Sequence, residues 1–363
     1  MKQLTTEKIQ RLVPYPPGKP IEELERELGI MGSIKLASNE NPIGPSPMAV
    51  KAIMDNLNRL NRYPDGSSYY LKEKLSQVFN LPMEMILIGN GSNELIELAI
   101  RTFLVPGQEV IQPFPTFLVY EKVVNGAGGE LVSVDLRDFR IDLDAVKKAI
   151  TSKTKLIFIN NPNNPTGTGL SKEEIKGFLK WVPEDIVIVI DEAYVEFASE
   201  KVARGTDLLD VHERLIVLRT FSKLYGLAGL RIGYGFSSPE IVDYINRVRQ
   251  PFNANLLAQT AAVAALDDAD FVKKTLDLTR EGLKYLFEKL DEMGLSYVPT
   301  ETNFFLIRVP SGAKNIYHLM LKEGVIVRSM ESYGLKEYIR VNVGLSSENE
   351  RFINTLKKVI HSL

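Results

Sequence analysis

The stretch LIVLRTFSKLYGLAGLR, residues 215–231, joins an apolar run to a loop of small residues. The run Leu215–Leu218 predicts a buried strand, and Lys223 follows it in the loop, with Ser222 before it and Arg231 after it. A lysine in this place suits an amine that forms a Schiff base, with a hydroxyl and a guanidinium nearby to hold a phosphate. Taken alone, the segment also fits a solvated lysine in a flexible loop, so the rest of the chain has to decide.

Outward from this stretch, strand and helix patterns alternate. The apolar runs that predict strands are Met85–Ile88, Glu109–Gln112, Glu130–Val134, Leu156–Ile159, Ile186–Ile190, Leu215–Leu218 and Ile232–Phe236, with Pro113 expected to stop the second of them. Helical periodicity covers 94–103 and 143–150, and a capping box at Ser171 and Glu174 opens a helix to Trp181. Continuous Val/Ile runs separated by helices predict an α/β fold with a mostly parallel sheet covered on both faces. Ligands bind at the carboxyl ends of such strands.

The pattern changes after about residue 255. A long charged amphipathic helix is expected over 271–293, followed by short strands and a closing helix over 349–363. We therefore predict a large domain over residues 45–255 and a smaller α+β domain built from residues 1–44 and 256–363.

Composition is that of an ordinary globular enzyme. The 363 residues are 44% hydrophobic and 25% charged, with a formal net charge of −2, which argues against a dedicated nucleic-acid binder. The absence of cysteine excludes disulfides and thiolate catalysis, and the three histidines lack metal-ligand spacing, so no metal site is expected. The opening MKQLTTEKIQ has no apolar segment typical of a signal peptide, and the cytoplasm is the expected location.

Three clusters of polar residues follow predicted strands. Gly89-Asn90-Gly91-Ser92-Asn93-Glu94 opens a helix whose free N–H groups could hold a phosphate, although an ordinary tight turn is equally compatible. Asn160-Asn161-Pro162-Asn163-Asn164-Pro165-Thr166-Gly167 is more specific, and we predict a cis Asn164–Pro165 bond. Asp191-Glu192-Ala193-Tyr194 places a carboxylate at the end of a buried strand, which is costly unless a cation such as a protonated pyridine nitrogen pairs with it. A helix N-cap is the plainer role for Asp191.

In this order, these motifs resemble those of the fold type I pyridoxal-phosphate aminotransferases. Three further stretches narrow the resemblance to the histidinol-phosphate aminotransferase family: Pro14-Tyr15-x-Pro-Gly-Lys-Pro, Leu36-Ala37-Ser38-Asn39-Glu40-Asn41-Pro42, and Arg62-Tyr63-Pro64-Asp65-Gly66. The resemblance covers the chain from about residue 10 to its end. It implies pyridoxal 5'-phosphate as the cofactor and histidinol phosphate with 2-oxoglutarate or glutamate as substrates.

The resemblance also implies roles for individual residues. Lys223 would form the Schiff base and move the proton, and Asp191 would pair with the pyridine nitrogen. Asn164 and Tyr194 would form hydrogen bonds with the ring's phenolic oxygen, and Phe117 would stack on the ring. The cofactor phosphate would be bound by Ser92, Asn93, Ser222 and Arg231, with Tyr63 reaching it from the other subunit of a homodimer. Arg340 would clamp the substrate carboxylate, and Tyr15 and Arg328 are candidates for the substrate phosphate.

Two departures and three alternatives bear on the substrate. Asn93 stands where relatives often have Asp, and Ile43 where an aromatic residue is common, so one wall of the substrate pocket differs. A decarboxylase of the same fold acting on a phosphorylated amino acid would keep Lys223, Asp191 and Arg340. Aromatic amino-acid transamination also fits, because phenyl and imidazole pockets are similar in size. A ligand-sensing regulator is disfavoured, since the arm before residue 35 has no room for a DNA-binding domain.

Overall fold

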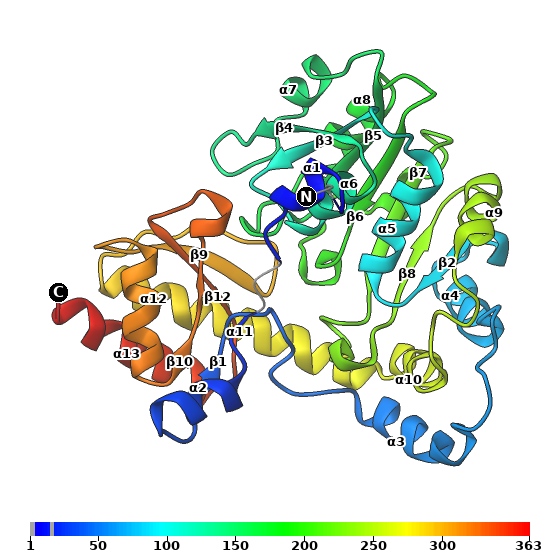
Figure 1. Cartoon of the computed structure of the whole chain (residues 1–363). Helices are drawn as coiled ribbons and strands as arrows, with labels where there is room; N and C mark the ends of the chain where they lie inside the picture. The colour runs from blue at the N-terminus through cyan, green and yellow to red at the C-terminus, as the bar shows by residue number, and fades with distance from the viewer. Residues whose placement is uncertain (1–3, 15–17) are drawn as a thin grey trace.

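The computed structural model describes residues 4–14 and 18–363, and its centre is a seven-stranded sheet of order β2-β8-β7-β6-β5-β3-β4 (Figure 1). The strands of this sheet are β2 (Ile86–Gly89), β3 (Glu109–Phe114), β4 (Glu130–Asp135), β5 (Thr154–Asn160), β6 (Val187–Asp191), β7 (Leu215–Thr220) and β8 (Gly233–Phe236). The pairs from β4 through β3, β5 and β6 to β7 are parallel, whereas β8 is antiparallel to both β2 and β7. The predicted α/β class with a mostly parallel sheet is confirmed.

The Val/Ile runs are continuous because both faces of the sheet are buried. In β5, Ile157 and Ile159 belong to the core on one face, while Leu156 and Phe158 belong to the core on the other. This alternation is the period of two expected of a strand. The helices around the sheet are α3 (Pro47–Asn56), α4 (Tyr69–Phe79), α5 (Ser92–Phe103), α6 (Val119–Gly126), α7 (Leu143–Lys148), α8 (Lys172–Leu179), α9 (Pro239–Val248) and α10 (Leu256–Leu266). The predicted capping box of α8 is confirmed.

A smaller lobe combines α2 and β1 from the N-terminal part of the chain with its C-terminal part (Figure 1). Its strands are β1 (Ile34–Lys35), β9 (Phe304–Arg308), β10 (Val325–Ile326), β11 (Arg328–Ser329) and β12 (Tyr338–Asn342), in sheets β1-β10 and β11-β12-β9. Its helices are α2 (Ile21–Leu28), α11 (Ala269–Glu292), α12 (Ala313–Lys322) and α13 (Ser346–His361), while α1 (Glu7–Arg11) lies against α6 of the large sheet. Leu36 joins Leu286, Phe305 and Phe352 in the core of this lobe.

The position of α10 bears on the domain boundary. The predicted division at residue 255 counts this helix with the small domain, whereas Ala258, Ala261 and Ala265 are buried in the core of the large sheet. These small side chains let α10 pack closely on α3. The domain limits themselves stay a prediction.

One predicted strand end is wrong. Pro113 does not stop β3, which continues to Phe114 and pairs with β4 up to Asp135. The pairing of β3 with β5 ends earlier, at Ile111. Because the strand has a single partner at this point, the missing N–H of Pro113 interrupts no ladder on the β5 side.

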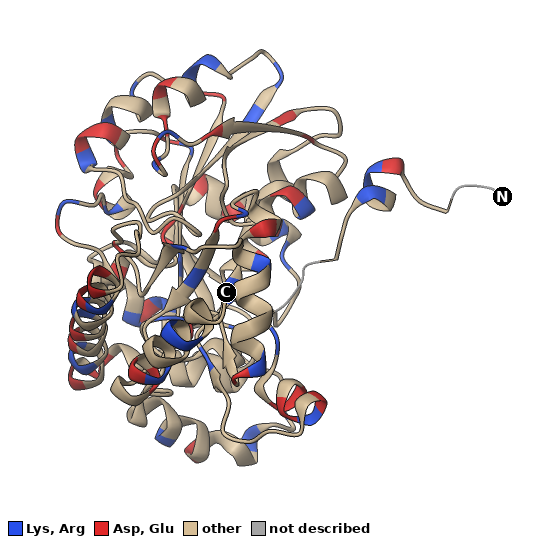
Figure 2. Cartoon of the chain, turned by 90° about the vertical axis from the view of Figure 1, so that its left-hand side faces the viewer, with Lys and Arg blue, Asp and Glu red and all other residues tan. Residues whose placement is uncertain are grey.

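The charged residues are mixed over the molecule. Figure 2 shows acidic and basic positions interspersed along the helices rather than gathered on one face. Within residues 4–14 and 18–363, no helix is both long and apolar enough to cross a membrane.

Candidate active site

A cavity of about 420 Å³ opens where β5, β6 and β7 end. In these parallel strands, Asn160 lies opposite Asp191, and Asp191 opposite Leu218, so the loops that follow them share one edge of the sheet. The cavity brings together the predicted site residues Ser92, Asn93, Phe117, Asn164, Asp191, Tyr194, Ser222, Lys223 and Arg231. These residues come from five separate stretches of the sequence and meet because parallel strands end on the same side.

Lys223 points its amine toward the N-terminal segment of the chain. Its Nζ donates to the carbonyl oxygen of Ser38 at 3.1 Å and lies 5.7 Å from the centroid of the Tyr194 ring. The loop that carries Lys223 packs tightly, since a side chain at Gly226 would come within 2.1 Å of the Gly44 carbonyl. Gly226 also has a positive φ of 68°, so glycine meets both demands there.

The turn before α5 and the end of the lysine loop form a phosphate-sized cradle. Gly91 has φ 78°, and a Cβ there would lie 2.5 Å from Nη2 of Arg231. Ser222 accepts from Thr220 at 3.0 Å and lies 3.5 Å from Nη1 of Arg231. A helix N-terminus, hydroxyls and a guanidinium are the donors that a phosphate needs, so this donor set fits the phosphate of the expected cofactor.

Asp191 also lines the cavity. It is buried, accepts from the Tyr120 hydroxyl at Oδ2 (2.6 Å) and from the Ala193 N–H at Oδ1 (3.2 Å). Burial raises the pKa of this carboxyl from 3.8 to about 6, although the Tyr120 hydrogen bond opposes the rise. A carboxylate in this state gains from a cationic partner, as the pyridine nitrogen of the expected cofactor would be.

Asn164 lines the cavity, and Arg340 of the small lobe lies against it. Nη1 of Arg340 donates to Oδ1 of Asn164 at 2.5 Å, and Nη2 donates to the Ala37 carbonyl at 2.8 Å. Arg340 is buried, and none of the salt bridges among residues 4–14 and 18–363 includes it. A buried guanidinium without a carboxylate partner calls for an anion, such as a substrate carboxylate or phosphate.

The asparagine and proline octet is built as a rigid support. The Asn164–Pro165 bond is cis, as predicted, and so are Asn161–Pro162 and Phe114–Pro115. Asn160 accepts from the backbone N–H of Asn164 at 2.7 Å and donates to the Asp191 carbonyl at 2.9 Å. Asn160 thus ties the backbones that carry Asn164 and Asp191 to each other.

Two further predicted residues, Tyr63 and Arg328, lie outside the cavity. Tyr63 is 83% exposed, stacks on Phe252 at 4.6 Å, and is outside the cavity. Arg328 is half-buried in β11, directly opposite Arg340 of β12. Tyr15 lies outside the described residues.

The structure adds residues that the sequence patterns missed. Tyr120 reaches Asp191 from α6, and its place three positions after Phe117 was the available signal. Asn39 donates to the Tyr194 hydroxyl at 2.9 Å, a contact that the motif over residues 36–42 did not predict. Ser38 and Asn160 complete this set.

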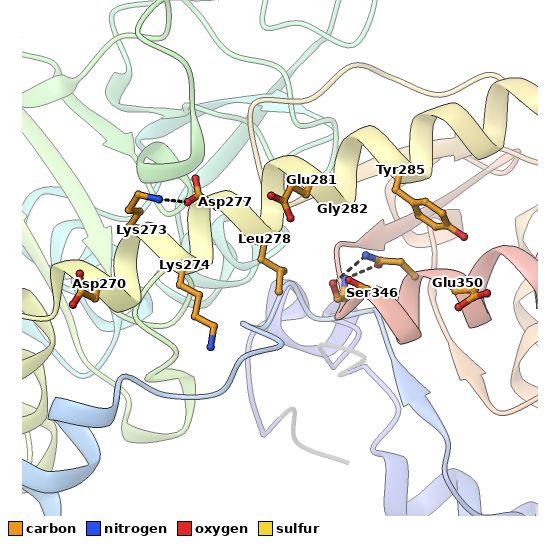
Figure 3. Close-up of a pocket in the computed structure, with 12 residues that line it drawn as sticks. Asp270, Lys273, Lys274, Asp277, Leu278, Glu281, Gly282, Tyr285, Ser346 and Glu350 are labelled. Carbon is orange, nitrogen blue, oxygen red and sulfur yellow. Dashed lines mark hydrogen bonds and ion pairs between the residues drawn. The ribbon is translucent and has the colours of Figure 1, made fainter.

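A larger groove, of about 850 Å³, runs along α11 on the small lobe (Figure 3). Lys273 pairs with Asp277 across one helical turn, and Lys274, Glu281 and Glu350 complete a wall of mixed charge. Exposed charges of both signs on a helix are typical of a solvated face. This groove shares no lining residue with the cavity that holds Lys223.

Known proteins resemble this chain in both sequence and fold. The family described as aminotransferase class I and II matches residues 32–356, so the chain belongs to that class. It is 45% identical over 357 residues to a histidinol-phosphate aminotransferase of Moorella thermoacetica, covering 98% of this chain and 92% of the relative. It is 47% identical over 361 residues to that of Desulfotalea psychrophila, covering 98% and 95%.

Among solved structures, histidinol-phosphate aminotransferase from Sinorhizobium meliloti in complex with pyridoxal-5'-phosphate superimposes with a TM-score of 0.92. The identity is 30%, with 99% of this chain and 98% of the other covered. Within its class, the chain belongs to the histidinol-phosphate aminotransferase family.

Proposed function

We propose that the protein is a pyridoxal-phosphate-dependent aminotransferase of histidine biosynthesis. It converts histidinol phosphate and 2-oxoglutarate into imidazole acetol phosphate and glutamate, and the reverse. The observation that carries this proposal is the meeting of Lys223, buried Asp191 and the Ser92–Arg231 cradle in one cavity of a chain that is 45–47% identical to named relatives.

Different residues of the cavity would hold different parts of the cofactor. Ser92, Asn93, Ser222 and Arg231 would bind the phosphate, Asp191 would pair with the ring nitrogen, and Phe117 would cover the ring face. When bound, pyridoxal phosphate supplies the electron sink that makes the substrate C–H bond acidic. Lys223 would hold the cofactor through its Nζ, and its amine, once free, would serve as the base that moves the proton at the reacting substrate carbon.

The anion site must accept two different substrates. Histidinol phosphate carries a phosphate and has no α-carboxylate, whereas glutamate carries two carboxylates. Arg340 offers a planar fork of donors that suits either anion better than a lysine point charge would. Arg328 lies beside it across the β11–β12 pair and adds positive charge, and Tyr15 is proposed as a further donor to the phosphate.

We further propose a homodimer in which Tyr63 completes the partner's phosphate site. Tyr63 is exposed and outside the cavity of its own chain, and exposed Met54, Leu57, Leu60 and Tyr70 lie near it in the sequence around α3 and α4. Large exposed apolar side chains in one region are typical of an interface. A cytoplasmic location accords with a biosynthetic role.

A steady-state assay tests the proposed reaction. The purified protein with pyridoxal phosphate is given histidinol phosphate, phenylalanine, tyrosine or aspartate, each with 2-oxoglutarate, and glutamate formation is measured. The highest kcat/KM is expected for histidinol phosphate. A higher value for phenylalanine or aspartate would refute the substrate while leaving the chemistry intact.

A decarboxylase is the second candidate, because L-threonine-O-3-phosphate decarboxylase from Porphyromonas gingivalis shares the fold, with a TM-score of 0.80 and 25% identity. Release of carbon dioxide from a phosphorylated amino acid, without any requirement for 2-oxoglutarate, would favour that reading.

A further inference from the structure

Consecutive residues of the N-terminal segment each reach a different side chain of the site. The Ala37 carbonyl accepts from Arg340 at 2.8 Å, and the Ser38 carbonyl accepts from Lys223 at 3.1 Å. Asn39 then donates from its side-chain Nδ2 to the Tyr194 hydroxyl at 2.9 Å. The first two contacts are made by the backbone, so Asn39 is the position where a substitution can remove one contact alone.

Asn39 is held firmly in place. It is 1% exposed, and its φ of 55° is a left-handed conformation that asparagine tolerates better than most residues. Its backbone N–H donates to Oδ1 of Asn342 at 3.0 Å, and its carbonyl accepts from Nδ2 of Asn303 at 3.3 Å. Both partners belong to the small lobe, so the segment is fixed before its amide meets Tyr194.

The direction of the bond to Tyr194 follows from chemistry. An amide nitrogen only donates, so the Tyr194 oxygen must accept, and its own proton is left for another acceptor. Turning the amide over would place Nδ2 where Oδ1 now lies, a buried position with no hydrogen-bond partner among the described residues. That arrangement would strand two N–H donors instead of one oxygen, which costs more.

We propose that Asn39 is a positioning residue that directs the Tyr194 hydroxyl proton into the cofactor cavity. This inference rests on the proposed function, because the acceptor would be the ring oxygen of pyridoxal phosphate. Tyr194 lines the cavity, and the charged groups around its hydroxyl and ring are Arg340 of β12, Asp191 of β6 and Lys223. Arg340 and the Asn39 amide both favour a phenol oxygen that accepts hydrogen bonds.

Two substitutions separate the direction of this bond from the mere presence of a side chain. Asn39→Asp keeps the size and tolerates the left-handed backbone, but a carboxylate accepts, so it takes the Tyr194 proton for itself. Asn39→Gly keeps the backbone conformation and removes the bond without reversing it. The probe is pyridoxamine 5'-phosphate, which has the same ring oxygen and phosphate but no aldehyde to react with Lys223.

Binding of this probe to cofactor-free protein is measured by equilibrium titration, with the melting temperature of each variant as the folding control. Asn39→Asp should raise Kd by about ten- to a hundredfold, the value of a hydrogen bond to a charged oxygen, and Asn39→Gly by less. In a Tyr194→Phe background, both substitutions should change Kd by less than about threefold, since no proton remains to be directed.

Several results would overturn the inference. Equal losses in Asn39→Asp and Asn39→Gly would mean that direction is irrelevant, and an undiminished loss in the Tyr194→Phe background would mean that Asn39 acts through another group. If Asn39→Asp does not fold, Asn39→Gly with and without Tyr194→Phe decides, because its effect must disappear in the second background. The amino substrate is absent from this titration, so a wrong substrate assignment would fail the activity assay and leave this result standing.

Discussion

Replacing Asp191 by asparagine should stabilise the cofactor-free protein at alkaline pH, although the same change should weaken cofactor binding. The native carboxylate is buried and forms no salt bridge among the described residues. It accepts hydrogen bonds from Tyr120 and Ala193. Burial raises its pKa from 3.8 to about 6, which means that the folded chain holds its proton more tightly than the unfolded chain does.

The sign and the size follow from this difference. Asp191 contributes its stability fully below about pH 3.8, and that contribution is lost as the pH rises through about 6. The ionised carboxylate therefore costs about 3 kcal/mol above pH 7, at about 1.4 kcal/mol for each tenfold change in acidity. Asparagine avoids this cost. Its NH2 group, however, must face either Tyr120 or Ala193, so one of the two hydrogen bonds is lost, at a cost of about 1 kcal/mol. The expected net gain is about 2 kcal/mol at pH 8, falling away toward pH 4.

Urea unfolding of the cofactor-free wild type and Asp191→Asn at pH 5 and pH 8 measures this gain, with both proteins at one concentration so that any association cancels. Asp210→Asn is the matched control, because Asp210 is exposed. Half-buried Glu196, whose pKa desolvation raises to about 7, adds the same pH dependence to both proteins, so its effect cancels in the difference. A gain of the same size at both pH values, or a loss at pH 8, would refute the reasoning.

Three further outcomes are expected. Lys223→Ala should lose the absorbance of the bound cofactor and nearly all turnover, and normal turnover would end its assignment. Arg340→Lys should lower kcat/KM about ten- to a hundredfold for both histidinol phosphate and glutamate, since a point charge replaces a bidentate fork. Tyr15→Phe should lower kcat/KM more for histidinol phosphate than for glutamate, and equal effects on both substrates would contradict its role. Mixing Tyr63→Ala with Lys223→Ala subunits should restore activity that neither variant shows alone, because one site of the mixed dimer then has both native residues. If no activity returns, the result would argue against a site that Tyr63 of the other subunit completes.

Much of the sheet was predictable because its information is local. Apolar runs such as Ile186–Ile190 are strands because both faces are buried, and the polar residues at their ends meet because parallel strands end on one side. The sequence did not reveal that β8 reverses its direction or that α10 packs on the large sheet, since strand direction and helix docking depend on distant partners.

The contacts that orient the site were the hardest to foresee. Asn39 and Asn342 are separated by 303 positions, and Tyr120 and Asp191 by 71. No spacing rule connects residues that far apart, because local patterns do not indicate which distant segments meet in the fold. Family resemblance identified the groups that would touch the cofactor, whereas the groups that hold those side chains in place became visible when the segments were brought together.

The hydrogen bonds that Asn164 and Tyr194 accept from Arg340 and Asn39 determine which donors in the cavity remain for a ligand. Arg340 only donates, so its bond to Asn164 fixes Oδ1 toward the guanidinium and leaves Nδ2 on the other side. Asn39 likewise donates to the Tyr194 oxygen, which leaves the phenolic proton of Tyr194 for another acceptor. Nδ2 of Asn164 and the Tyr194 hydroxyl are therefore both donors, and both residues line the cavity. A pair of donors suits an anionic oxygen, whereas buried Asp191, which lines the same cavity, suits a protonated nitrogen. The cavity therefore offers separate groups for an oxyanion and for a cationic nitrogen, the two charges that the ring of the expected cofactor would carry.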